Sequence, residues 1–120
     1  MKFCWATVTT DKLEESLQFY KEIVGLTTLR RFSPSDGVEI AFMTDGSGFE
    51  LELLKNGGSK GMQKDGISLG FTVHSLADTL ALVKSKGIAP FGGPVKVPGC
   101  AFFFVRDPNG VTLQFVENER

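Results

Sequence analysis

The sequence predicts an α+β fold built from two tandem βαβββ modules within a single domain, residues 1–120. An internal repeat leads to this prediction, because segment 42–53 resembles segment 104–115, with Phe, Asp, Gly and Leu in register. Both copies have the pattern of a strand, a tight Asp/Gly turn and a second strand. An amphipathic helix pattern precedes each copy. We therefore expect module one at about 1–55, a linker at 56–65 and module two at about 66–117.

Module one is expected to begin with a strand, followed by a helix near 12–24 and three further strands. Thr10 or Asp11 is placed to cap the helix, and Gly25 is placed to end it. The apolar stripe of this helix would consist of Leu13, Leu17, Tyr20 and Val24. The strands are expected near 3–9, 26–32, 38–44 and 48–54.

Module two has the same order of elements. Ser75 would cap its helix, with Asp78 forming a weak capping box, and Gly87 would end it. The helix stripes repeat after 63 positions and the closing glycines after 62, a one-residue drift that we assign to a loop. The stripe of this helix would consist of Leu76, Leu80 and Val83. The strands are expected near 67–73, 88–91, 100–106 and 111–117.

Composition argues against several classes of function. The chain has 13 Lys and Arg residues and 14 Asp and Glu residues, so it lacks the basic excess that binds nucleic-acid phosphates. Its apolar runs are far shorter than the roughly 20 residues of a membrane helix, and no secretory signal pattern follows Met1. Cys4 and Cys100 form no CxxC pair. We expect a cytoplasmic protein that binds neither nucleic acid nor membranes.

Side chains alternate between the faces of a strand, and four expected strands have one apolar and one mostly polar face. The two helices can cover the apolar faces from the outer side. The other faces mix small polar groups, carboxylates and aromatic rings, which suits a cavity inside a curved, partly open mixed sheet. Plain solvent exposure is the alternative. The candidate ligand-binding residues are Trp5, Phe42, Glu50, Glu52, Ser68, Thr72, Phe102, Phe104 and Gln114.

Two motifs resemble those of a known family. Phe19 and Tyr20 lie shortly before Gly25 in the first helix segment, and the sequence Asp-Pro-Asn-Gly at 107–110 precedes the last strand. With the duplicated βαβββ unit, these motifs resemble the vicinal-oxygen-chelate superfamily, which includes glyoxalase I, bleomycin-resistance proteins and extradiol dioxygenases. The resemblance covers nearly the whole chain and implies a small organic ligand and a homodimer. It is specific for the fold, which hosts many activities.

The resemblance also implies four metal-ligand positions, which fall on Trp5, Glu52, Ser68 and Gln114. Only Glu52 is a strong ligand, and Gln114 is a weak one through its amide oxygen. We therefore predict no cofactor, with a divalent metal held by Glu52 and Gln114 as the alternative. A one-residue shift of strand register would exchange Trp5 for Cys4.

Three other charged or titratable residues could contact a ligand. His74, the only histidine, is expected at the surface where a strand meets a helix. Arg30 and Arg31 lie on opposite sides of their strand, so at most one of them can face a ligand. A solvated surface charge is the favoured interpretation for both arginines.

The leading hypothesis is a small-molecule-binding protein of the glyoxalase/bleomycin-resistance type, whose two carboxylates suit a cationic or amphipathic ligand. The second is a divalent-metal lyase or isomerase resembling lactoylglutathione lyase, or a dioxygenase-like enzyme, although Phe104 stands where the dioxygenases have a tyrosine. The third is an interaction module with a vestigial cavity. In an enzyme, Glu52 would be the general base, because desolvation beside aromatic rings raises a carboxyl pKa. Hydrogen bonding to a neighbouring threonine is the alternative for one of the two carboxylates.

Overall fold

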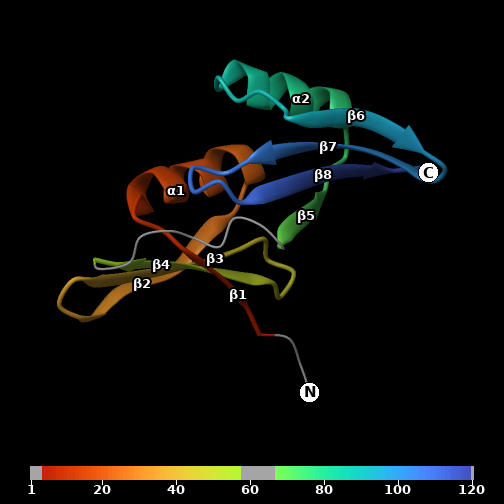
Figure 1. Ribbon diagram of the computed structural model, residues 1–120. Helices are drawn as coiled ribbons and strands as arrows, with labels where there is room; N and C mark the ends of the chain where they lie inside the picture. The colour runs from red at the N-terminus through yellow and green to blue at the C-terminus, as the bar shows by residue number, and fades with distance from the viewer. Residues whose placement is uncertain (1–3, 58–66, 120) are drawn as a thin grey trace. The chain divides into compact units, whose positions relative to one another are not determined.

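Figure 1 shows the computed structural model of the 120-residue chain, in which residues 4–57 and 67–119 are described. The chain divides into two compact units, residues 1–62 and 63–120. Over the described residues, each unit holds one four-stranded mixed sheet and one α-helix, which confirms the predicted α+β class and the two βαβββ modules. Most of the predicted linker lies outside the described residues. Within the described ranges, no helix is long and apolar enough to cross a membrane.

Unit 1 (residues 1–62) has the strand order β1-β4-β3-β2. β1 runs parallel to β4, and the other neighbouring strands are antiparallel. The elements of this unit are β1 (Ala6–Thr9), α1 (Leu13–Phe19), the π-helical stretch η1 (Tyr20–Val24), β2 (Thr27–Ser35), β3 (Val38–Thr44) and β4 (Glu50–Asn56). The helix and strands lie close to their predicted positions.

Unit 2 (residues 63–120) repeats this topology with the strand order β5-β8-β7-β6. β5 runs parallel to β8, as β1 does to β4. The elements of this unit are β5 (Ser68–Thr72), α2 (Leu76–Ser85), β6 (Gly92–Val97), β7 (Cys100–Arg106) and β8 (Thr112–Asn118). The matching strand orders show that the sequence repeat is a repeat of structure.

β6 lies at 92–97, so the strand predicted near 88–91 is wrong. Residues that usually interrupt strands lie inside β6. Gly93 has a φ of +84°, and a Cβ at this position would lie 2.8 Å from the Phe102 carbonyl oxygen. Pro94 is tolerated because β6 is an edge strand, which forms its ladder of hydrogen bonds on one side only.

Each helix covers the apolar face of its own sheet. α1 packs against β4, and α2 packs against β8. Leu51 and Leu53 of β4 and Leu113 of β8 are fully buried, and Phe115 is 1% exposed. This arrangement confirms the prediction that the helices cover the apolar sheet faces.

The buried stripe of α1 and η1 is only partly as predicted. Leu13 and Tyr20 are buried, whereas Leu17 and Val24 are half-buried. Ser16 can take a buried position because its hydroxyl donates to a backbone carbonyl of the preceding turn, at 2.7 Å. The other buried positions that the sequence pattern missed are Phe19 and Ile23.

The two helices begin differently. The predicted cap of the first helix is wrong, because Lys12 rather than Thr10 or Asp11 occupies the cap position, with no side-chain cap bond. Thr10 acts two residues earlier, where its Oγ1 accepts the Lys12 N–H at 2.8 Å. The second helix begins as predicted, with Ser75 Oγ accepting the Asp78 N–H at 3.1 Å.

The one-residue drift between the modules lies in the first helix, so its assignment to a loop is wrong. After this helix the Leu26 N–H donates to the Tyr20 carbonyl, six positions back. After α2 the Ile88 N–H donates to the Val83 carbonyl, five positions back. The extra residue is therefore accommodated where the helix widens to π geometry in η1.

Candidate functional site

One face of the unit 1 sheet carries four of the predicted ligand-binding residues. A row of directly paired residues crosses it from Arg30 through Phe42 and Glu52 to Thr7, one on each strand. Alternation along β4 places Glu50 on the same face as Glu52. The residues that define this surface, called the Phe42 face from here on, are Trp5, Thr7, Arg30, Phe32, Phe42, Glu50 and Glu52.

Aromatic rings form the middle of the Phe42 face. The Phe42 ring is 5% exposed and meets the edge of Trp5 at a centroid distance of 5.4 Å. Phe32 stacks nearly parallel to Phe42, with the ring centroids 6.5 Å apart. Trp5 and Phe32 remain 48% and 44% exposed, so they present aromatic surface above a buried ring. Phe32 is not among the predicted residues, although its alternation with Arg30 along β2 could have placed it on this face.

The charged groups of the Phe42 face are already partly neutralised. The Arg30 guanidinium lies 4.0 Å from the centre of the Phe42 ring, and its Nη2 lies 3.0 Å from Glu50 Oε1. Glu52 Oε1 accepts a hydrogen bond from the Thr7 hydroxyl at 2.6 Å. Of the two interpretations given for these carboxylates, general base or hydrogen bonding to a neighbouring threonine, this contact is the second. The sequence hypothesis treated both carboxylates as available to a cationic ligand. In the structure Glu50 is paired with Arg30, so only Glu52 lacks an ionic partner among the described residues of this face.

Unit 2 carries the equivalent surface with almost no charge. Its row of paired residues runs from Gly92 through Phe104 and Gln114 to Gly70. Glu52 of unit 1 thus corresponds to Gln114, as the repeat predicts. The predicted residues of this surface, called the Phe104 face from here on, are Ser68, Thr72, Phe102, Phe104 and Gln114.

Phe91 and Arg106 lie beside the Phe104 face, and the sequence analysis missed both. Phe91 is 50% exposed, and its ring centroid lies 5.8 Å from that of Phe104. The Arg106 guanidinium lies 4.3 Å from the centre of the Phe91 ring. His74 is exposed after β5, as expected. The predicted cavity shared by the two modules, and the role of these residues in binding, stay predictions.

The donor set does not fit a transition-metal site of the His and carboxylate type. Within the described ranges, no group of three or more His, Cys, Asp and Glu residues is placed to hold a metal ion. On the Phe42 face, Trp5 has no group that binds a metal, and Glu50 is paired with Arg30. On the Phe104 face, the amide of Gln114 and the hydroxyl of Ser68 are weak ligands.

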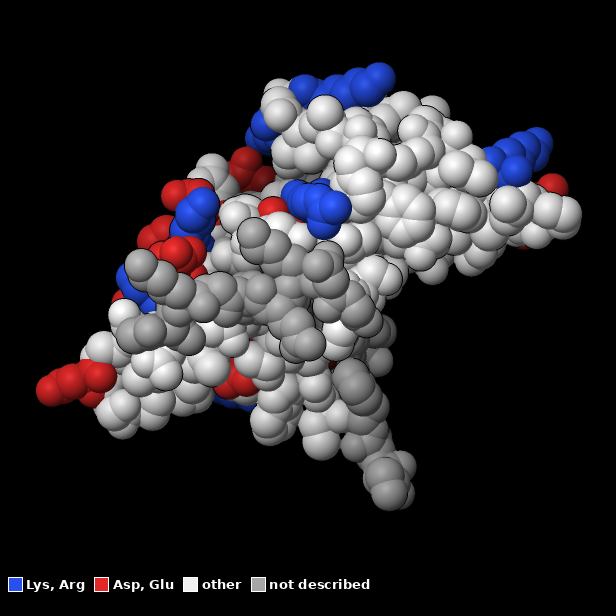
Figure 2. Space-filling model, viewed as in Figure 1, with Lys and Arg blue, Asp and Glu red and all other residues white. Residues whose placement is uncertain are grey.

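Charges of both signs are mixed on the surface in view in Figure 2. Lys and Arg side chains appear there at several separate places and do not gather into one patch. With 13 basic and 14 acidic residues in the chain, this face offers no basic surface that would follow a phosphate backbone. The expectation that the protein binds no nucleic acid stays a prediction.

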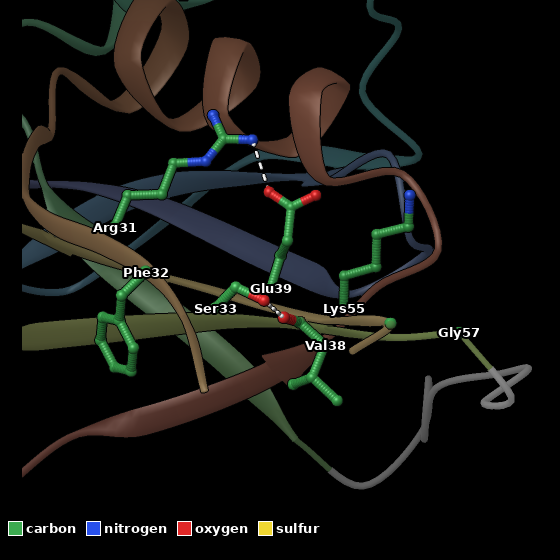
Figure 3. A pocket seen from close by; sticks show the side chains of 8 residues that line it. Arg31, Phe32, Ser33, Val38, Glu39, Lys55 and Gly57 are labelled. Atoms are coloured by element: carbon green, nitrogen blue, oxygen red, sulfur yellow. Dashed lines mark hydrogen bonds and ion pairs between the residues drawn. The ribbon is translucent and has the colours of Figure 1, made fainter. Parts of the chain in front are cut away.

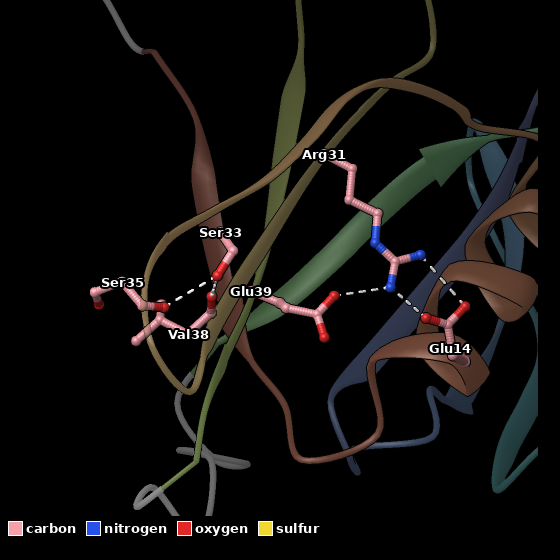
Figure 4. Close-up of polar contacts among 6 residues, drawn as sticks. All are labelled: Glu14, Arg31, Ser33, Ser35, Val38 and Glu39. Carbon is pink, nitrogen blue, oxygen red and sulfur yellow. Dashed lines mark hydrogen bonds and ion pairs between the residues drawn. The ribbon is translucent and has the colours of Figure 1, made fainter.

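An open pocket of about 580 Å³ lies at the β2–β3 hairpin of unit 1, and Arg31, Glu39 and Lys55 reach into it on the helix side (Figure 3). Arg31 Nη2 contacts Glu14 of α1 and lies 2.9 Å from Glu39 Oε2 (Figure 4). Two carboxylates already hold this guanidinium, so it is less available to an anionic ligand in the pocket. The contacts instead tie α1 to the hairpin.

Replacement of Glu14 is expected to lower stability only at a pH where its carboxylate is charged. The hydrogen bond from Arg31 lowers the pKa of Glu14 below its ordinary value of 4.5, against the effect of desolvation. Such a group contributes stability above its unfolded pKa and loses it as the pH falls through the folded value. We expect Glu14→Gln to lower the urea midpoint at neutral pH and to leave it unchanged at about pH 2.

Urea unfolding of the wild type and the variant across this pH range measures the difference. Glu15→Gln, which removes the adjacent exposed carboxylate of the same first turn, is the control for the helix-dipole effect and is expected to give a smaller loss than Glu14→Gln at neutral pH. An equal loss for Glu14→Gln at neutral and acid pH would contradict the role of the Arg31 contact.

Comparison with known sequences gives two kinds of match. A family model described as "Glyoxalase/Bleomycin resistance protein/Dioxygenase superfamily" matches residues 2–115. The lactoylglutathione lyase of Haemophilus influenzae is 32% identical over 89% of this chain and 85% of that protein. The lactoylglutathione lyase GLX1 of Arabidopsis thaliana is 30% identical over 97% of this chain and 44% of that protein. This chain therefore spans less than half of the plant relative.

Solved structures share the fold at lower identity. Glyoxalase I from Zea mays has a TM-score of 0.83 and 22% identity, over 98% of this chain and 47% of that chain. TnmS3, an antibiotic binding protein from Streptomyces sp. CB03234, has a TM-score of 0.78 and 19% identity, over 99% of this chain and 97% of that chain. Likeness at these identities shows a common fold, which does not decide between binding and catalysis.

Proposed function

This chain belongs to the glyoxalase/bleomycin resistance protein/dioxygenase superfamily, and we propose that within it the chain binds a small aromatic organic ligand without a complete metal site. The exposed aromatic surface of the Phe42 face is the observation that carries this proposal. Trp5 and Phe32 are about half exposed above a buried Phe42. A flat apolar ligand that covers these rings removes them from water and stacks on them. TnmS3, an antibiotic binding protein with this fold, is a precedent.

Polar groups at the rings would orient the ligand. Glu52 lies directly across the strand pair from Phe42, and its carboxylate accepts a hydrogen bond from the uncharged Thr7 hydroxyl. Gln114 lies across from Phe104 in the same way. A pocket that combines aromatic walls with a few placed polar groups is typical of small-molecule sites. In this proposal Glu52 attracts a cationic group of a ligand on the Phe42 face, and Gln114 offers a neutral hydrogen-bonding group to a ligand on the Phe104 face.

Glu52→Gln is expected to weaken a cationic aromatic ligand about fivefold and a neutral one much less, because a partly exposed charge contributes up to about 1 kcal/mol. Ethidium is the cationic probe, and phenanthridine is the uncharged probe with the same fused rings. Quenching of Trp5, the single tryptophan of the chain, reports binding at this face. Glu15→Gln, on the helix side, is the matched control. Equal losses of affinity for the two probes would contradict the role of the Glu52 charge.

The second candidate is a divalent-metal lyase or isomerase resembling lactoylglutathione lyase, with Glu52 as general base and with Glu52 and Gln114 as metal ligands. The relatives of that name, at 30% and 32% identity, favour it. The donor set of the two faces argues against it. Elemental analysis of protein purified without chelator or metal-affinity tag separates the candidates. Near-stoichiometric transition metal would support the enzyme, and a metal-free protein whose Tm rises with aromatic ligands would support binding.

A homodimer and a cytoplasmic location complete the proposal. The first follows from the family to which the chain belongs, and the second follows from the cysteine content of the sequence. Light scattering on the purified protein measures the oligomeric state, and a mass of one chain would contradict the dimer.

A further inference from the structure

We propose that Arg30 sets the charge of the ligand that the Phe42 face accepts, because it is the internal counter-ion of Glu50. The inference rests on the proposed binding function and adds a ligand class to it. The face selects a flat aromatic monocation over a dication and over an anion.

Two contacts hold Arg30 in the position that this role needs. Its guanidinium lies 4.0 Å from the Phe42 ring centre, which is within the range of a cation–π contact. Its Nη2 lies 3.0 Å from Glu50 Oε1. Phe42 is itself fixed between Trp5 and Phe32, so the ring is a rigid platform for the guanidinium. The Arg30 and Glu50 side chains are 48% and 30% exposed, so a ligand on the rings meets the pair directly.

The charges of this face then sum to a single negative charge. Among its described residues, the charged ones are Arg30, Glu50 and Glu52. Arg30 neutralises Glu50, whereas Glu52 receives only the neutral Thr7 hydroxyl. One positive charge on a ligand is therefore matched, a second finds no partner, and an anion is repelled. Specificity of this kind comes from unfavourable interactions with the wrong ligand as well as from favourable interactions with the right one.

The second module shows that the βαβββ framework does not require this pair. At the positions equivalent to Arg30 and Glu50, unit 2 has Gly92 and Thr112, and Gly92 lies opposite Phe104 as Arg30 lies opposite Phe42. The row on the Phe104 face has the same register without an ion pair. The Arg30–Glu50 pair is therefore a feature of one face, which favours a role in specificity over a role in building the sheet.

The test compares three probes on the wild-type protein and its variants. Ethidium has one positive charge, propidium has the same ring system with two, and 8-anilinonaphthalene-1-sulfonate has one negative charge. Trp5 quenching and calorimetry give the affinities. In Arg30→Gln both carboxylates are uncompensated, so we expect the preference for propidium over ethidium to rise about fivefold. In Glu50→Gln the unpaired Arg30 offsets Glu52, so we expect ethidium to weaken and the sulfonate to strengthen.

Three further variants separate charge from structure. The double variant Arg30→Gln/Glu50→Gln restores one net negative charge, and we expect it to regain the wild-type preference. Arg30→Lys keeps the charge and is expected to behave as the wild type within about twofold. Arg31→Gln makes the same substitution one position along β2, on the helix side, and is expected to leave the preference unchanged. Tm values identify any variant that is not folded.

The outcomes distinguish failure of the Arg30 role from failure of the proposed binding function. Probes that quench Trp5 but show the same charge preference in Arg30→Gln as in the wild type would overturn the role of Arg30 and leave the binding function standing. Failure of all three probes to bind the folded wild type would overturn the binding function and this inference with it. Failure of the double variant to regain the wild-type preference would also overturn the charge assignment.

Discussion

Phe42→Ala is expected to lower the free energy of unfolding by about 3–5 kcal/mol, the range for removal of a buried phenylalanine. The ring is 5% exposed and is contacted by Trp5, by Phe32 and by the Arg30 guanidinium. Its loss leaves a cavity and removes the support of all three side chains. Urea or guanidinium unfolding, followed by circular dichroism, measures the change.

Phe32→Ala is the matched comparison, because this ring stacks on Phe42 but is 44% exposed. We expect it to lower the free energy of unfolding by about 1 kcal/mol, the value of an aromatic contact at the surface. Its larger effect is expected on ligand affinity, since its exposed surface is part of the proposed site. A Phe32→Ala protein as unstable as Phe42→Ala would mean that both rings belong to the core.

Asp107→Ala is expected to lower the free energy of unfolding by about 2–4 kcal/mol, because it leaves one buried and one part-buried backbone donor without an acceptor. Asp107 is 5% exposed, and its Oδ1 accepts the N–H of Asn109 at 2.7 Å and that of Val111 at 2.9 Å. These bonds hold the turn between β7 and β8, which aligns Phe104 with Gln114.

Asp45→Ala tests the equivalent turn of the first module, since the repeat aligns Asp45 with Asp107. The Asp45 side chain accepts hydrogen bonds from the Ser47 N–H and hydroxyl, but the residue is exposed. Water can replace those bonds, so we expect a loss below about 1 kcal/mol. Equal losses for the two variants would show that the burial of Asp107 is not what makes its turn sensitive.

Much of the architecture could be predicted because the sequence contains the same βαβββ pattern twice. The offset between the copies predicted that Glu52 and Gln114 occupy equivalent places, and the strand register shows them opposite Phe42 and Phe104. The period of two along a strand placed Glu50 with Glu52. These are rules of backbone geometry, which a sequence expresses directly.

The neutralisation of Glu50 could not be predicted, because it depends on a contact between distant strands. Alternation places Arg30 and Arg31 on opposite sides, but it does not say which one meets a carboxylate on β4. Local rules also failed at the first helix cap, where Thr10 bonds to Lys12 before the helix begins. The late start of β6 depends on its being an edge strand that tolerates Pro94.

The π-helical stretch at Tyr20–Val24 has a consequence for the history of the two copies. One extra residue in a regular α-helix rotates everything beyond it by about 100°. Here the widened turn absorbs the insertion locally, so Leu13 before it and Leu26 after it both stay buried. The alternation of side chains along β2 is therefore unchanged, and Arg30 still lies opposite Phe42. The copies have thus diverged in length inside a helix, at a site where an insertion or deletion leaves the ligand-facing strand in place.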